Sequence, residues 1–232
     1  MLKDPHRRRG LGPERRDTVD AVLARRQPDL TVLAEALHKP RNFSAIIRTC
    51  DAVGINDVHT VAGANEVPVH WKTSQGAEKW VRVHAHAALS DACRVLRAGG
   101  FQLIAAHLSD AAVDYRDIDY TQPTALVVGT ELWGVSDAAL AETDRQIVIP
   151  MKGMTQSLNV SVACAIVLYE ALRQRDAAGF YDTRRLAGDA YRRQRFEWLH
   201  PKVARFCRER GLDYPEVDAE GRITGSFPRG AA

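Results

Sequence analysis

The sequence predicts an α/β fold built on a largely parallel β-sheet. Short apolar runs that suit strands alternate with segments of helical periodicity through the middle of the chain. The strand-like runs are apolar throughout, which is typical of strands whose two faces are both covered by helices. A length of 232 residues is sufficient for one domain with a substantial hydrophobic core and short appendages.

The expected elements follow in chain order, each bounded by a turn or capping signal. The first helix ends at Pro28, and the double glycine Gly99–Gly100 stops a later one. We expect helices at 14–27, 42–54, 90–100, 135–144 and 157–179. We expect strands at 30–37, 57–63, 81–87, 101–108, 124–129 and 145–151.

Charge is distributed unevenly, although the net charge is only +3. Residues 1–26 hold eight Lys or Arg against four Asp or Glu, and residues 181–210 hold nine against four. Residues 27–180 are acidic, with thirteen basic residues against seventeen acidic ones. The pattern predicts a basic N-terminal helical arm at 1–26, a central α/β domain at 27–180 and a basic C-terminal extension at 181–232. Two basic arms suit a polyanion such as nucleic acid, while two ordinary solvated helices remain the alternative.

Several classes of function are excluded. No GxGxxG follows the first strand, and the glycines at 129–134 lack the lysine of a P-loop. His84 and His86 have no evident third ligand, so we expect no metal. No run of 18 apolar residues predicts a membrane span, and the first ten residues lack the apolar stretch of a secretory signal. Four widely spaced cysteines without a CxxC pair fit reduced thiols, so we expect a cytoplasmic protein.

The first of three polar segments runs from Asn42 to Arg48. Ser44 and Arg48 are four residues apart and share a helix face. Asn42 suits a helix N-cap, and Arg48 suits either a solvated position or a functional one.

The other two polar segments follow presumed strands. Glu131 comes just after the strand at 124–129, where ligands gather in open α/β sheets, although a surface carboxylate is the alternative. Ser157 and Asn159 open a helix after a loop that contains Gly153. Ser157 could be a plain N-cap, or the helix start could receive an anion or a polar ligand.

Together the three segments resemble the motifs of the SPOUT superfamily, in its branch of RNA ribose 2′-O-methyltransferases. They read NFSAIIR at 42–48, VGTELWG at 128–134 and IPMKGMTQSLNVSVA at 149–163. Further stretches at 23–32, 38–54, 107–121 and 154–175 closely resemble the TrmH family, which methylates guanosine 18 in the D-loop of tRNA. Arg41 departs from the pattern, because several family members carry histidine there.

The resemblance implies a fold that periodicity could not supply. Members of the superfamily have a parallel sheet with a C-terminal deep trefoil knot, and this chain would add N- and C-terminal helical extensions. The knot loops, here Gly129–Gly134 and Ile149–Leu158, would hold S-adenosyl-L-methionine in a bent shape. Family members are homodimers whose active site draws on both subunits.

The resemblance also implies roles for individual residues. Arg48 would activate the ribose hydroxyl, but a guanidinium is a poor base, so a role as phosphate clamp and hydroxyl orienter stays open. Asn42 and Asn159 would orient Arg48 or the ribose, Glu131 would fix its loop or a partner side chain, and Ser157 would position a phosphate or hydroxyl. The residues that would cradle the cofactor are Leu108, Gly129, Ile149, Met151 and Leu158.

The substrate implied is tRNA, bound through the basic arms. The residues expected to contact RNA are Arg25, Arg26, Arg41, Arg192, Arg193, Arg195 and Lys202. Phe196 and Trp198 could stack on a base, but packing of the extension is the favoured use. The alternatives are 2′-O-methylation of another RNA such as 23S rRNA, for which too few residues precede Asn42 to form an RNA-binding domain, and a catalytically silent RNA-binding protein.

Overall fold

The computed structural model describes residues 13–61, 77–130 and 133–224. The chain divides into two compact units. The sheet unit is Gln27–Asp182, and the helical unit combines Met1–Arg26 with Thr183–Ala232. The two basic ends of the chain therefore belong to one folded unit, although 156 residues of the sheet unit separate them in sequence.

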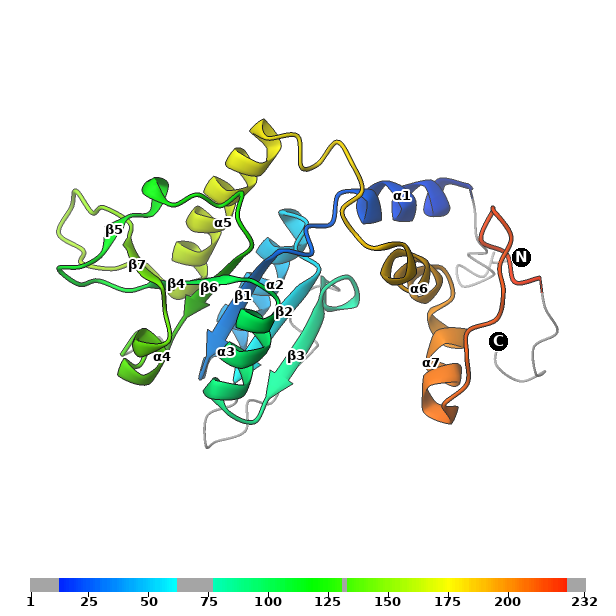
Figure 1. Ribbon diagram of the computed structural model, residues 1–232, viewed down its shortest axis with the longest axis horizontal. Coiled ribbons are helices and arrows are strands. Elements are labelled where there is room, and N and C mark those ends of the chain that lie inside the picture. The colour runs from blue at the N-terminus through cyan, green and yellow to red at the C-terminus, as the bar shows by residue number, and fades with distance from the viewer. Residues whose placement is uncertain (1–12, 62–76, 131–132, 225–232) are drawn as a thin grey trace, which may run out of the picture. The chain divides into compact units, whose positions relative to one another are not determined.

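The sheet unit contains a seven-stranded sheet in which neighbouring strands pair in parallel. The strand order is β3-β2-β1-β6-β4-β7-β5, so β6 is the central strand and lies between β1 and β4 (Figure 1). The prediction of an α/β fold with a parallel sheet is confirmed. The strands are β1 (Leu30–Glu35), β2 (Asp57–Val61), β3 (Arg82–His86), β4 (Gln102–Ala106), β5 (Val113–Asp114), β6 (Thr124–Val128) and β7 (Arg145–Val148).

Helices cover both faces of this sheet, because each central strand is apolar on both sides. In β6, Leu126 and Val128 pack in one core cluster with residues of α2 and α5, whereas Ala125 and Val127 pack in a second cluster with residues of α3 and α4. The helices of the unit are α2 (Pro40–Ala52), α3 (Leu89–Ala98), α4 (Asp137–Ala141) and α5 (Val160–Ala177), with short 3₁₀ turns η1 (Ala77–Lys79) and η2 (Tyr115–Asp117).

Two helix starts differ from the sequence prediction. Helix α2 begins at Pro40 with Lys39 as its N-cap, so Asn42 lies inside the first turn and its prediction as an N-cap was wrong. Proline suits the first helical position because it has no N–H to leave unsatisfied. Helix α5 begins at Val160 and is capped by Asn159, whose side chain accepts from the N–H of Ser161, so it starts later than predicted.

Arg175 links the carboxyl end of α5 to the loops that precede β1 and β6. Its side chain is fully buried and lies 2.6 Å from the carboxylate of Asp29. It also donates to the backbone carbonyls of Tyr120, Asp29 and Gln122 and to the side chain of Gln27. A buried guanidinium is tolerated here because its donors are satisfied by oxygen atoms.

The helical unit contains α1 (Pro13–Ala24), α6 (Gly188–Leu199) and α7 (Pro201–Arg210). Val19 and Leu23 of α1 are buried, and so are Phe196 and Trp198 of α6. The favoured interpretation of these aromatic residues, as packing groups instead of base-stacking platforms, fits this burial. No helix in the described part of the chain combines the length and the apolarity that crossing a membrane requires.

Candidate functional site

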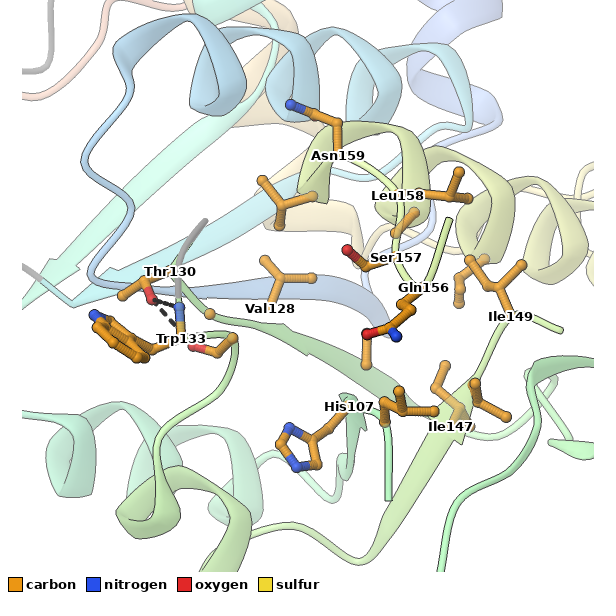
Figure 2. Close-up of a pocket in the computed structure, with 18 of the residues that line it drawn as sticks. His107, Val128, Thr130, Trp133, Ile147, Ile149, Gln156, Ser157, Leu158 and Asn159 are labelled. Atoms are coloured by element: carbon orange, nitrogen blue, oxygen red, sulfur yellow. Dashed lines mark hydrogen bonds between the residues drawn. The ribbon is translucent and has the colours of Figure 1, made fainter. Parts of the chain in front are cut away.

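A pocket of about 540 Å³ opens above the carboxyl ends of β4, β6 and β7. Figure 2 shows side chains from three chain segments around it. His107 follows β4, Val128, Thr130 and Trp133 lie at and after the end of β6, and Ile147, Ile149 and residues 156–159 lie between the end of β7 and the start of α5. Parallel strands bring their carboxyl ends to one edge, which is where ligands bind in open α/β sheets.

The five residues predicted to cradle a cofactor all line this pocket: Leu108, Gly129, Ile149, Met151 and Leu158. They come from three loops that lie far apart in the sequence. The structure therefore brings together, around one pocket, the five residues that the family resemblance indicated.

Glycine is required at position 129 because the loop after β6 folds back on itself. A Cβ atom there would lie 1.9 Å from the backbone oxygen of Gly134. Thr130 and Gly134 exchange two backbone hydrogen bonds of 2.8 and 3.0 Å, and Gly134 has a φ of +70°. Trp133 donates its backbone N–H to Oγ1 of Thr130. Glu131, predicted to fix this loop, lies outside the described residues.

The first and third polar segments meet through their asparagines. Nδ2 of Asn159 donates to Oδ1 of Asn42 at 3.2 Å, across the contact between α2 and α5. The side-chain oxygen of Asn159 also accepts from the N–H and hydroxyl of Ser161. Asn159 and Ser157 line the pocket, and Asn42 is buried behind Asn159.

Arg48 is not among the pocket-lining residues. It lies on the exposed face of α2, where Arg41 is exposed two turns earlier, while Ser44, Ile46 and Ile47 are buried. The helical period explains the separation, because positions 41 and 48 project together and away from the sheet. Within a single copy of the chain, Arg48 therefore does not line the pocket together with Ser157 and Asn159.

The pocket contains polar residues that motif reasoning did not single out. They are Lys39, His107, Thr130 and Gln156, with Trp133 largely exposed at the rim. Lys39 is the one lining side chain with a formal charge at neutral pH among the described residues. All five lie within the stretches that resemble the family, after a strand or next to a helix start. That position is the sequence feature from which they could have been predicted to line the pocket.

The histidines on β3 are engaged with neighbouring side chains. Nε2 of His84 lies 2.6 Å from the carboxylate of Asp57, and Nε2 of His86 lies 2.8 Å from Nδ1 of His59. In the described part of the chain, no group of three His, Cys, Asp or Glu residues is arranged to hold a metal ion.

Two of the residues predicted to contact RNA, Arg26 and Arg195, are instead largely buried within the helical unit. Arg26 is fully buried, with its guanidinium 5.1 Å from the ring centre of Trp198. Arg195 is 14% exposed and forms an ion pair of 2.6 Å with Asp20 of α1. A count of basic residues does not distinguish buried arginines from exposed ones. In the helical unit, packing within α1 and α6 determines which arginines reach solvent.

The other predicted RNA contacts are exposed, but they differ in their partners. Arg192 pairs with Asp189 and Arg193 with Glu197, both within α6. Residues Arg25, Arg41 and Lys202 are also exposed.

A parallel α/β fold with a glycine-dependent loop and a pocket at the strand ends defines a class of proteins that bind a small molecule or cofactor. Sequence comparison specifies the class. Residues 29–169 match the SpoU rRNA Methylase family, and residues 173–226 match the family described as SpoU, rRNA methylase, C-terminal. The chain belongs to the SpoU methylase family.

Individual relatives support this membership. The chain is 46% identical to the tRNA (guanosine(18)-2'-O)-methyltransferase of Escherichia coli K12 over 215 residues, covering 92% of this chain and 94% of that protein. The crystal structure of the A. aeolicus TrmH/SpoU tRNA modifying enzyme superposes with a TM-score of 0.76 at 40% identity, covering 82% of this chain and 98% of that one. The SpoU methyltransferase AviRb from Streptomyces viridochromogenes, solved in complex with the cofactor AdoMet, has a TM-score of 0.58 at 31% identity, covering 65% and 62%.

Proposed function

We propose that this protein transfers a methyl group from S-adenosyl-L-methionine to the ribose 2′-hydroxyl of guanosine 18 in tRNA. The observation that carries the proposal is the assembly of all three motif segments, at Asn42, Gly129 and Asn159, around or directly behind one pocket. The Escherichia coli relative that bears this activity in its name aligns with nearly the whole chain, including the basic extension.

The pocket fits S-adenosyl-L-methionine by the chemistry of its walls. Ile149, Met151 and Leu158 would supply an apolar surface for the adenine ring, and the folded loop at Gly129 would offer backbone groups to the cofactor. When bound, the cofactor supplies the activated methyl group. A relative in the same family binds AdoMet, which supports this assignment.

The chain's own residues must position the hydroxyl and exclude water, because the cofactor carries the reactivity. Ser157 and Asn159 present a hydroxyl and an amide on the pocket wall, and Asn42 holds Asn159 from behind. In this proposal Ser157 positions a substrate phosphate or hydroxyl and Asn159 orients the ribose. Glu131 keeps its proposed role of stabilising the loop after β6.

Arg48 completes the site from a second copy of the chain. Its guanidinium is exposed on α2 and outside the pocket of its own chain. Beside α2, the neighbouring helix α5 exposes the apolar side chains of Val162 and Tyr169, which suits a subunit interface. We therefore assign a homodimer in which Arg48 of one subunit clamps a phosphate and orients the hydroxyl at the other subunit's pocket.

A C-terminal trefoil knot is part of the same proposal. Both loops contribute lining residues to the pocket: Gly129, Thr130, Trp133 and Gly134 from the first, and Ile149, Met151, Gln156, Ser157 and Leu158 from the second. Threading of one loop by the other would fix this arrangement without any ligand. The similarity to the A. aeolicus TrmH/SpoU structure over most of the chain supports it.

The experiment is methyl transfer to an unmodified tRNA transcript with labelled S-adenosyl-L-methionine, followed by an alkaline ladder. A 2′-O-methyl group removes the nucleophile for alkaline cleavage, so one gap is expected at guanosine 18. A transcript with 2′-deoxyguanosine at that position should accept no label. A gap at another nucleotide would support ribose methylation but reject guanosine 18 as the target. Label in 23S rRNA alone would favour the alternative substrate. A methylated base would reject 2′-O-methylation itself. Since tRNA is the substrate, we place the reaction in the cytoplasm.

A further inference from the structure

The basic residues of the helical unit divide between two helices with different ion pairing. Helix α6 carries three arginines and two carboxylates, and helix α7 carries three arginines and one lysine against one carboxylate. If the unit binds the backbone of tRNA, its cations are not equivalent, because a cation already held by a carboxylate gains less from a phosphate.

The arginines of α6 are each close to an acid. Arg192 bonds to Asp189 one turn earlier, and Arg193 lies 3.4 Å from Glu197 one turn later. Arg195 points to α1, where it forms two hydrogen bonds with the carboxylate of Asp20. The surface charge of α6 is therefore largely compensated within the unit.

Helix α7 is different because its exposed face is mainly cationic. Lys202 forms no ion pair with any residue in the described part of the chain, and Arg205 is 71% exposed. Arg205 and Arg210 approach only Glu209 among the described carboxylates, each at 3.9 Å, a separation at which an exposed pair contributes little.

The amphipathic pattern of α7 keeps these charges on the solvent side. Ala204 and Cys207 are fully buried, so the face that carries Lys202 and Arg205, three residues apart, projects outward. Arg208 lies at the edge of this face and is shared with Glu197 and Tyr214.

We propose that the helical unit binds the phosphate backbone of tRNA through the outer face of α7, defined by Lys202, Arg205 and Arg210, and not through α6. This rests on the proposed function for the identity of the RNA. The occupant is set by charge: a row of exposed cations with one weakly held carboxylate complements a polyanion. The sequence prediction ranked Arg192, Arg193 and Lys202 together, whereas the ion pairs separate them.

The test compares two charge-matched variants of the full-length protein. In Lys202→Gln/Arg205→Gln and in Arg192→Gln/Arg193→Gln, two exposed cations are removed from the surface of one helix. Binding to an unmodified tRNA transcript is measured over a series of KCl concentrations. We expect the α7 variant to bind several-fold more weakly and to flatten the slope of log affinity against log salt by about 0.9 for each duplex phosphate that is no longer neutralised. The α6 variant should change both quantities much less.

Two further measurements separate the possible causes of weaker binding. The charge-conserving variant Lys202→Arg/Arg205→Lys should restore the wild-type slope, which separates a charge effect from a folding defect. Methyl transfer by the wild-type protein is measured in parallel. Failure of the wild-type protein to methylate tRNA would reject the proposed function, whereas an unchanged salt slope in the α7 variant with wild-type methyl transfer intact would reject only the assignment to α7. An unchanged slope in the α7 variant, or an equal or larger loss of affinity in the α6 variant, overturns the assignment.

Discussion

Asn42 and Asn159 are 117 residues apart in the chain and share a hydrogen bond of 3.2 Å between their side-chain amides. This bond joins the first turn of α2 to the N-cap of α5. The position of Asn159, which lines the pocket, therefore depends on a residue from a distant segment of the chain. Since Asn42 is buried, replacing Asn159 would take one hydrogen bond away from a buried amide oxygen.

A double-mutant cycle measures this coupling. We expect Asn42→Ala and Asn159→Ala each to lower the free energy of unfolding, and the double variant to lose less than the sum by about 0.5–1.5 kcal/mol, because both single changes remove one shared bond. Urea unfolding gives the three values. Strict additivity would contradict a direct interaction.

Arg48→Ala should abolish methyl transfer and leave binding of S-adenosyl-L-methionine near the wild-type level, because Arg48 does not line the pocket of its own chain. Arg48→Lys should rescue poorly, since an ammonium lacks the planar fork of a guanidinium. Mixing Arg48→Ala with a pocket-defective Gly129→Ala chain should restore part of the activity through heterodimers with one complete site. If activity stays absent in verified heterodimers, the assignment across subunits is wrong.

Glycine 129 offers a steric test of the pocket loop. Gly129→Ala would place a Cβ atom 1.9 Å from the backbone oxygen of Gly134, so the loop must open and we expect cofactor binding to be lost. Gly153→Ala is the matched control, because a Cβ there meets no heavy atom within 4 Å. Calorimetric titration with S-adenosyl-L-methionine distinguishes the two. Wild-type affinity in Gly129→Ala would show that the loop does not shape the site.

Arg175 should be a stability residue despite its charge. Arg175→Gln leaves Asp29 and several carbonyl oxygens without their buried donor, and we expect a loss of roughly 3–5 kcal/mol in the free energy of unfolding. Arg173→Gln, two positions earlier, removes the ion pair between the exposed guanidinium of Arg173 and Glu170, and it should lower the free energy of unfolding by only about 1 kcal/mol or less. Equal effects of the two changes in urea unfolding would be inconsistent with the buried network.

The histidine cluster predicts how stability depends on pH. Burial, and secondarily the charges of His84 and His86, lowers the pKa of His59 to about 4 from its ordinary value of 6.5. The unfolded chain then binds a proton that the folded chain refuses, so this contribution to stability is complete above pH 6.5 and is lost as the pH falls toward 4. The pKa of His86 is also lowered by burial and acts in the same direction. His59→Gln should reduce the slope of unfolding free energy against pH in this window, and an unchanged slope would show that His59 is accessible to protons when folded.

Local pattern was enough to predict the alternation of strands and helices. Apolar runs and turn residues are properties of neighbours in sequence, and they located β1, β6 and α3 to within a few residues. Motif resemblance selected Leu108, Gly129 and Leu158, which the structure brings to one pocket. The short strand β5 had no usable pattern, because two residues are too few for a period.

The sequence by itself thus determined the α/β class, the motif segments and the presence of two basic ends. Only the tertiary structure decided that these ends form one unit, that Arg26 and Arg195 are held by Trp198 and Asp20, and that Arg48 lies outside its own pocket. The physical reason is the sequence separation of the residues that interact. Periodicity reports contacts within a few residues along the chain, whereas burial of a side chain and pairing of a charge depend on groups that come close only when distant segments pack.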